Sequence, residues 1–230
     1  MQHLTLRPVL LLFSIFISIT ACSKKTDDPP APDRTESMKN TVWSGEYQYT
    51  AGDLVSPQPF SVSLAADGTL TWHDIESSRP GGTWLMKQDT IRITFPNNTG
   101  FSATVGIDSW SSFKADASAG VLVSSVIAAK PSESLSLGNT NWTGTHYGSK
   151  LDITLFTDLK MTYKLGGGDV INTTYTMEGA GIRFTYTGIT SQVSNYANIT
   201  SNGTVMKAIE KRISGFPYKT TYMSYATTKL

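Results

Sequence analysis

Phe60-Ser61-Val62-Ser63-Leu64 and Leu151-Asp152-Ile153-Thr154-Leu155 decide the fold of this chain. Both stretches alternate apolar and polar residues, and a period of two places the apolar side chains on one face of a β-strand. The second stretch begins 91 positions after the first, and residues 60–95 align with residues 151–186 without a gap. The chain therefore contains the same strand pattern twice.

Matched apolar and aromatic residues extend the duplication over several strands. They form the pairs Phe60/Leu151, Val62/Ile153, Leu64/Leu155, Leu70/Met161, Trp72/Tyr163, Trp84/Tyr175, Met86/Met177, Ile91/Ile182, Ile93/Phe184 and Phe95/Tyr186. Upstream, Asn40-Thr41-Val42-Trp43-Ser44-Gly45 recurs as Asn139-Thr140-Asn141-Trp142-Thr143-Gly144, 99 positions later. Each copy therefore starts at a Trp-x-Gly motif and continues through short alternating strands.

Turn residues separate these strands. Asp67-Gly68 and Asn202-Gly203 are the pairs that tight hairpins prefer, because both positions tolerate positive φ. We expect a meander of roughly six to eight antiparallel strands in each copy. The two copies define β-domains at residues 39–131 and 138–230, and we expect strands to pair within a copy, since each contains its own hairpins.

The closure of each meander determines the architecture of this all-β chain. An open meander has two unpaired edge strands, and curling into a barrel removes both. A Trp near the start of the first strand, followed by hairpins and a final strand, resembles the small lipocalin-like barrels of Gram-negative lipoproteins. The family's first-strand signature is Gly-x-Trp, whereas both copies here have Trp-x-Gly. The resemblance implies two tandem lipocalin-like small barrels; a β-sandwich is the alternative closure.

The N-terminus indicates export and lipid attachment. Arg7 precedes an apolar run that starts at Val9 and ends at Ile19-Thr20-Ala21-Cys22. The run is shorter than the roughly 20 apolar residues of a membrane-spanning helix, and it is typical of a secretory signal peptide, here residues 1–21. Its end resembles the lipobox of bacterial lipoproteins. Cys22, the single cysteine of the chain, is therefore the expected lipid attachment site.

The segment after the cysteine reads as a spacer. Residues 22–38 contain Pro29, Pro30 and Pro32 and few large apolar side chains, a composition typical of disordered linkers. We expect the mature protein to be anchored through its lipid in the envelope of a Gram-negative bacterium, at the outer membrane, with exposure at the cell surface left open.

Groups that could carry catalysis are sparse. The 19 basic and 18 acidic residues balance, which does not favour a nucleic-acid-binding face. His73 and His146 are the two histidines beyond the signal peptide, and they do not align in the repeats. His73 follows Trp72 on a strand, so we expect it to point to solvent. The sequence also lacks Gly-x-Ser-x-Gly and His-Glu-x-x-His. We therefore expect no catalytic residue, no metal, no cofactor and no enzymatic activity.

Aromatic residues are the remaining candidates for a binding site. Trp72 and Trp84 align with Tyr163 and Tyr175, so both copies carry aromatic side chains on the inner face of the strands. Such side chains either fill a small barrel or line a cavity at its end. Trp110 has no counterpart in the second copy. We expect it in a loop, either as an exposed sugar-stacking platform or as a buried anchor.

These features favour a membrane-anchored, non-enzymatic binding lipoprotein that holds a small apolar or amphipathic ligand or an envelope partner. Two alternatives stay open. A surface carbohydrate-binding module would use Trp110 and the tyrosine-rich second copy to hold a glycan. A structural or assembly lipoprotein of the envelope would bind a protein partner and no small molecule.

Overall fold

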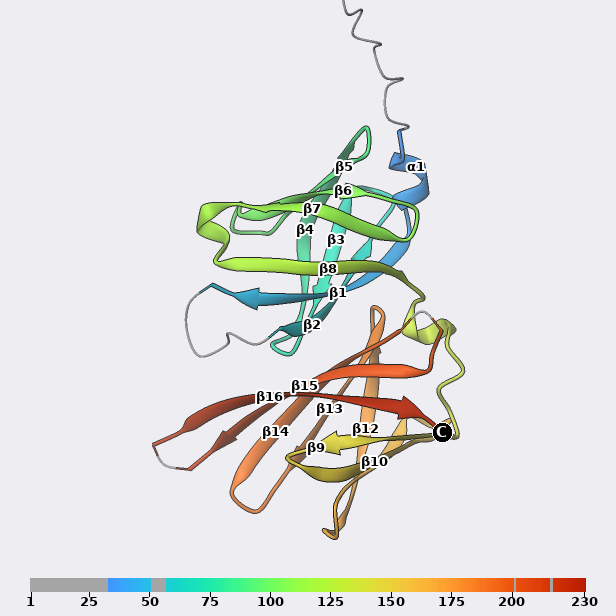
Figure 1. Cartoon of the computed structure of the whole chain (residues 1–230), viewed down its shortest axis with the longest axis vertical. Helices are drawn as coiled ribbons and strands as arrows, with labels where there is room; N and C mark the ends of the chain where they lie inside the picture. The colour runs from blue at the N-terminus through green and yellow to red at the C-terminus, as the bar shows by residue number, and fades with distance from the viewer. Residues whose placement is uncertain (1–32, 51–56, 201, 216) are drawn as a thin grey trace, which may run out of the picture. The chain divides into compact units, whose positions relative to one another are not determined.

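The described part of the chain folds into two closed antiparallel β-barrels of eight strands each (Figure 1). This computed structural model describes residues 33–50, 57–200, 202–215 and 217–230. Cys22, the apolar run before it and most of the expected spacer lie outside the described residues. Each barrel is a meander closed on itself, as in small lipocalin-like barrels, and the β-sandwich alternative is wrong.

The first barrel closes when its last strand pairs with its first. Its strands are β1 (Thr41–Tyr49), β2 (Gln58–Leu64), β3 (Thr69–His73), β4 (Ser78–Lys87), β5 (Thr90–Thr94), β6 (Gly100–Val105), β7 (Ser109–Ala115) and β8 (Val121–Ala129). Every strand pairs with the next, and β1 also pairs with β8. A 3₁₀ turn, η1 (Ala117–Ala119), joins β7 to β8.

The second barrel repeats this order, and no strand is shared between the two. Its strands are β9 (Thr140–His146), β10 (Ser149–Leu155), β11 (Lys160–Leu165), β12 (Val170–Glu178), β13 (Gly181–Thr187), β14 (Ser191–Ile199), β15 (Val205–Ser214) and β16 (Lys219–Lys229). Pairing of β16 with β9 closes it. A second 3₁₀ turn, η2 (Ser132–Ser134), lies in the connection between the barrels. The expectation that strands pair within each copy is confirmed.

The alternation of apolar and polar residues along the strands places apolar side chains in the core of each barrel. The ten matched pairs place their side chains inside the barrels, where most are fully buried and Phe95, Met177 and Tyr186 are partly buried. Trp43 and Trp142 lie near the start of the first strand of each barrel, and each indole Nε1 donates to the hydroxyl of Thr41 or Thr140 at 2.9 Å. The duplicated Thr-x-Trp motif thus fills the same end of both barrels in the same way.

The last residues of the expected spacer are folded. Helix α1 (Thr35–Met38) precedes β1, and the Met38 side chain is 1% exposed within the core of the first barrel. The prediction of a disordered linker that reaches residue 38 is therefore wrong for the last residues of that segment. Met38 is apolar and close to β1, so its burial orders the short helix. Among the residues that the structure describes, no helix is both long and apolar enough to cross a membrane.

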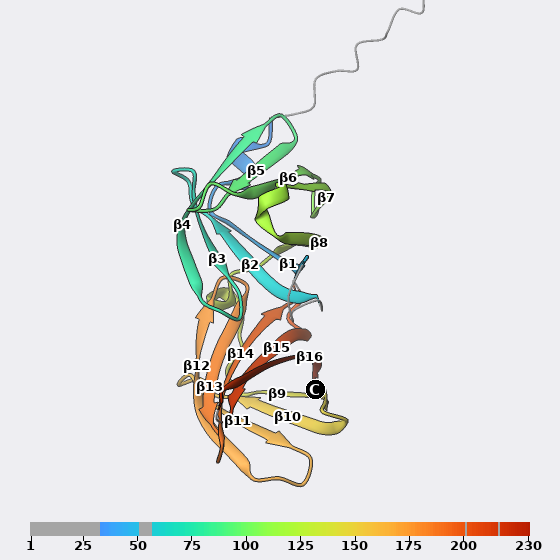
Figure 2. The same ribbon diagram turned by 90° about the vertical axis from the view of Figure 1, so that its left-hand side faces the viewer.

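The barrels also contact each other along the outer faces of β2 and β3. The β3–β4 and β12–β13 hairpins meet there (Figure 2). Ser61 on β2 is fully buried, and its hydroxyl lies 2.7 Å from the Tyr196 hydroxyl of β14. It also accepts the backbone N–H of Ala180 at 3.1 Å. Outward-facing polar residues of the first barrel are therefore covered by the second.

Strand closure explains the Trp-x-Gly motifs. A Cβ placed on Gly45 would lie 2.2 Å from the carbonyl oxygen of Ser125 on β8. A Cβ on Gly144 would lie equally close to the carbonyl oxygen of Ala226 on β16. Both distances are far below van der Waals contact. In each barrel, glycine permits the close approach of the first strand to the last.

Gly144→Ala should therefore destabilise the protein by about 1–3 kcal/mol, because the added methyl group forces the closing strands apart. Chemical denaturation measures the change in the free energy of unfolding. Gly167→Ala is the matched control, since a Cβ there meets no atom within 4 Å, and it should stay within about 0.5 kcal/mol of the parent. Equal effects of the two substitutions would contradict the packing argument.

Candidate functional site: the mouth of the first barrel

A cavity of about 560 Å³ opens at one end of the first barrel, where β1 and β5 end and β4 and β8 begin. We call this end the mouth. Most of the cavity wall is aromatic or aliphatic, with a few polar groups. The lining residues are Tyr47, Tyr49, Leu70, Trp72, Ser78, Arg79, Pro80, Gly82, Phe95, Pro96, Asn97, Thr99 and Val121.

Trp72 forms a fixed part of this wall. Its ring stacks on Phe60, with centroids 3.9 Å apart and planes inclined by 9°. Phe95 meets it edge-on at 5.2 Å and Tyr47 at 5.8 Å. Contacts on several sides leave the indole little freedom to move, so the aromatic wall is formed before any ligand arrives.

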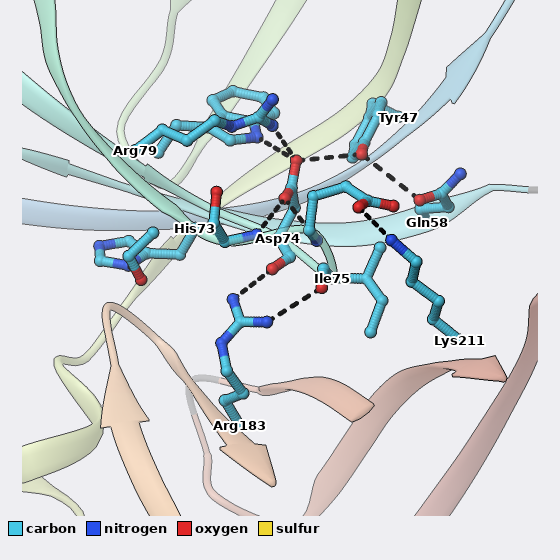
Figure 3. Close-up of polar contacts among 12 residues, drawn as sticks. Tyr47, Gln58, His73, Asp74, Ile75, Arg79, Arg183 and Lys211 are labelled. Carbon is cyan, nitrogen blue, oxygen red and sulfur yellow. Dashed lines mark hydrogen bonds and ion pairs between the residues drawn. The ribbon is translucent and has the colours of Figure 1, made fainter. Parts of the chain in front are cut away.

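A buried carboxylate, that of Asp74, connects the polar groups of the mouth (Figure 3). Its Oδ2 accepts hydrogen bonds from the Tyr47 hydroxyl at 3.1 Å and from Trp72 Nε1 at 3.0 Å. The same oxygen forms an ion pair with Arg79. One carboxylate oxygen therefore sets the position of three side chains that line the cavity.

The other carboxylate oxygen fixes the loop itself. Asp74 Oδ1 accepts the backbone N–H groups of Glu76 at 3.0 Å and Ser77 at 3.3 Å, which closes the β3–β4 loop over the carboxylate. Burial, together with the negative charge of Asp74, raises the pKa of the Tyr47 hydroxyl far above its usual range. The Tyr47 hydroxyl therefore keeps its proton well above the ordinary range and can donate it to Asp74.

The mouth combines an apolar wall with one cationic group at its rim. The Arg79 side chain is 47% exposed, whereas the Asp74 carboxylate is fully buried. Its ion pair uses one terminal nitrogen of the guanidinium, and the group has five N–H donors in total. This arrangement suits a molecule with an apolar body and a polar end that faces Arg79 and Asn97.

The corresponding end of the second barrel is built around Glu210 instead. Its buried carboxylate accepts hydrogen bonds from His146 Nε2 at 3.2 Å and from the hydroxyls of Tyr147 at 2.8 Å and Tyr186 at 3.2 Å. Arg212 Nε donates to it at 3.1 Å. Because an ionised carboxylate only accepts, His146 Nε2 is the donor in this hydrogen bond. These side chains form a polar network across this end of the barrel.

Two members of this network occupy positions that are apolar or aromatic at the mouth. His146 aligns with Tyr47 at the offset of 99, and Tyr186 aligns with Phe95 at the offset of 91. Burial raises the pKa of Glu210, but hydrogen bonds from His146 and Tyr147 and the charge of Arg212 outweigh burial and hold that pKa below its ordinary value. Glu210 is therefore ionised near neutral pH.

The ionised Glu210 should make stability depend on pH. Because its pKa is lower in the folded state, its contribution is complete above about 4.5, the ordinary value, and is lost as the pH falls through the folded-state pKa. We expect Glu210→Gln to lower the free energy of unfolding by about 1–3 kcal/mol at neutral pH. That difference should shrink as the pH falls from neutral to well below 4.5.

Urea denaturation of both proteins across this range measures the effect. Glu36→Gln is the control, since Glu36 lies exposed on α1 with 84% of its side chain accessible. A Glu210→Gln deficit that is constant with pH would contradict the role given to the ionised carboxylate.

The aromatic residues predicted from the sequence separate into two groups. Trp72 lines the cavity. Trp84, Tyr163 and Tyr175 are buried in the barrel cores and lie outside the cavity wall. Trp84 Nε1 donates to the Ala65 carbonyl at 2.9 Å, and the Tyr175 hydroxyl donates to the Phe156 carbonyl at 3.1 Å. Both interactions are structural.

The prediction that Trp110 lies in a loop is wrong, and of the two alternatives given for its side chain the exposed platform is excluded because the indole is buried. It belongs to β7, is 3% exposed and packs against Trp43 with ring centroids 5.2 Å apart. The strand was missed because its alternation is broken. Ser112 has φ of 54°, and the register between β6 and β7 shifts between Ser102 and Thr104.

His73 points out of its barrel, as alternation requires, yet it is only 8% exposed rather than solvated. The β12–β13 turn of the second barrel covers it, and a Cβ on Gly179 would lie 2.7 Å from its ring. Its Nδ1 lies 2.8 Å from the Ser78 hydroxyl, which donates to Glu178 at 2.5 Å. Burial lowers the pKa of His73. The residue belongs to the joint between the barrels.

Sequence reasoning missed Tyr47, Asp74 and Arg79. Asp74 is part of the titratable stretch after Trp72, and alternation from Trp43 predicts that Tyr47 points inward. Their combination at one site depends on the registers of the neighbouring strands β1 to β4, which the sequence pattern does not give. In the described ranges, no three His, Cys, Asp or Glu side chains gather in a way that could hold a metal ion.

Comparisons of this chain with protein-family models, with curated proteins and with solved structures gave no match. The fold and the geometry of the mouth are therefore the basis on which a function can be argued.

Proposed function

We propose that this protein is a lipid-anchored binding protein of the bacterial envelope that holds a small amphipathic ligand in the mouth of its first barrel. The observation that carries the proposal is the cavity of about 560 Å³ with its aromatic wall and half-exposed Arg79. Cavities of roughly 300–1,000 Å³ with apolar walls and a few placed polar groups are typical of small-molecule sites.

The wall suggests how such a ligand would lie. Its apolar part would contact Trp72, Phe95 and Val121, and its polar end would face Arg79 at the rim. Every apolar Å² removed from water contributes about 25 cal/mol to binding before the costs of association are subtracted. Because the Trp72 ring is already fixed by its neighbours, little of that gain is lost to ordering the wall.

Filling the cavity tests the proposal. Val121 lines the cavity, whereas the adjacent Leu122 points outward and is 50% exposed. We expect fatty acids or anilinonaphthalene sulfonate to raise the melting temperature of the chain from Ser23 onward by several degrees at about 100 times the dissociation constant. Val121→Trp should abolish this shift, and Leu122→Trp should preserve it.

Soluble glycans form the second arm of that experiment. A shift with glycans that Val121→Trp leaves intact would support a carbohydrate-binding surface instead. No shift with either panel would contradict a small-molecule function and favour an assembly role with a protein partner. Trp110 no longer supports the glycan reading, because its indole is buried.

The lipid anchor is proposed from Ile19-Thr20-Ala21-Cys22. Acyl chains contribute roughly 0.8 kcal/mol per buried CH₂, and more than one chain is needed for stable anchoring. Metabolic labelling with an alkyne-tagged palmitate should mark the parent protein, and Cys22→Ala should eliminate both the label and membrane sedimentation. Labelling that persists in Cys22→Ala would rule out this attachment site.

A further inference from the structure

The β3–β4 loop contacts the interior of the first barrel and the outer wall of the second barrel. Asp74 directs its carboxylate into the mouth of the first barrel, while the backbone of the same loop lies against the outer wall of the second barrel (Figure 3). Ile75, at the tip, is 2% exposed and packs against Tyr196 and Ile209 of the second barrel. The loop is thus held by contacts on both sides.

Arg183 of β13 makes the polar part of that contact. Its Nη1 donates to the Ile75 carbonyl at 3.0 Å, and its Nη2 donates to the Asp74 carbonyl. The guanidinium thus binds the carbonyls of two consecutive residues. Since backbone carbonyls need partners when they are buried, removing Arg183 would leave both without the donor that the structure provides.

The guanidinium is itself held in place. Glu178 accepts Arg183 Nε with both carboxylate oxygens at 3.0 Å, and the Arg183 side chain is 17% exposed. The Tyr196 ring lies 5.5 Å from the guanidinium carbon. The Nε–H is thus shared between the two oxygens, and such a partly buried, charge-assisted contact is more rigid than an exposed ion pair. Arg183 therefore occupies a fixed position, and its hydrogen bonds to the two carbonyls hold the β3–β4 loop in place.

We propose that Arg183 of the second barrel is a positioning residue for the cavity of the first barrel. It fixes the backbone of Asp74 and Ile75, and the Asp74 carboxylate in turn fixes Tyr47, Trp72 and Arg79. The second barrel thereby sets the geometry of a site to which it contributes no lining residue. By thermodynamic linkage, a ligand in the mouth strengthens the contact between the barrels by the same factor.

Arg183→Met tests this role in the full chain, because methionine preserves much of the aliphatic stem and removes the guanidinium. The first readout is the Trp72 indole N–H resonance in protein labelled with ¹⁵N-tryptophan and assigned with Trp72→Phe. This N–H donates to Asp74, so displacement of the loop should shift or broaden its signal. The readout needs no ligand.

The second readout is the affinity for anilinonaphthalene sulfonate, and it rests on the proposed ligand-binding function. We expect Arg183→Met to weaken binding by roughly 5- to 100-fold, the usual range of coupling between sites. Lys207→Met is the matched control. Lys207 forms another ion pair between the barrels, with Glu46 at 2.9 Å, away from the β3–β4 loop. It should change neither readout.

The possible outcomes distinguish the positioning role of Arg183 from the proposed ligand-binding function. An unchanged Trp72 resonance in folded Arg183→Met would overturn the positioning role, whether or not the probe binds. A shifted resonance in a protein whose parent binds no probe would support the positioning role and refute the ligand. If Arg183→Met does not fold, Arg183→Lys, which can reach fewer acceptors, takes its place. If the Trp72 indole N–H resonance of Arg183→Lys matches that of the parent protein, the positioning role is also overturned.

Discussion

Closure of the meander is the constraint on which the rest of this structure depends. When the first strand must pair with the last, their backbones meet at Gly45 in one barrel and at Gly144 in the other, where no side chain fits. The Trp two residues earlier fills the barrel at the end where the first strand begins. The opposite end is therefore the place where each barrel can be open, and there the repeats differ.

Both open ends contain a buried carboxylate with an arginine, yet the carboxylates come from different strands. Asp74 follows β3, while Glu210 lies on β15. The repeat-two residue that aligns with Asp74 is Leu165, which is apolar. Aromatic neighbours of Asp74 leave a cavity, whereas His146 and the tyrosines around Glu210 form a hydrogen-bonded network. One architecture thus supports two different interiors, with a binding site argued for only one.

The parts of the structure that follow from period-two alternation could be predicted from the sequence. Inner faces, hairpins, the duplication and pairing within each copy all depend on local pattern. The strand position of Trp110 was not predicted, because a strand with a residue at positive φ no longer alternates. The mouth was not predicted for another reason: Tyr47 and Asp74 are 27 residues apart in the chain, and they meet through the registers of β1 with β2 and of β2 with β3, which alternation alone does not determine. The burial of His73 depends on which outer faces touch, and local pattern carries no information about that.

The joint between the barrels is head-to-tail, because a loop of one repeat rests on the wall of the next. Interfaces of this kind can propagate from copy to copy and build open filaments. Here the position equivalent to Ile75 is Gly166, the first of three consecutive glycines. The second repeat lacks the apolar tip with which the first one docks. A loop with glycine at this position offers no apolar side chain to a further barrel, so the contact that joins the two repeats does not propagate through it.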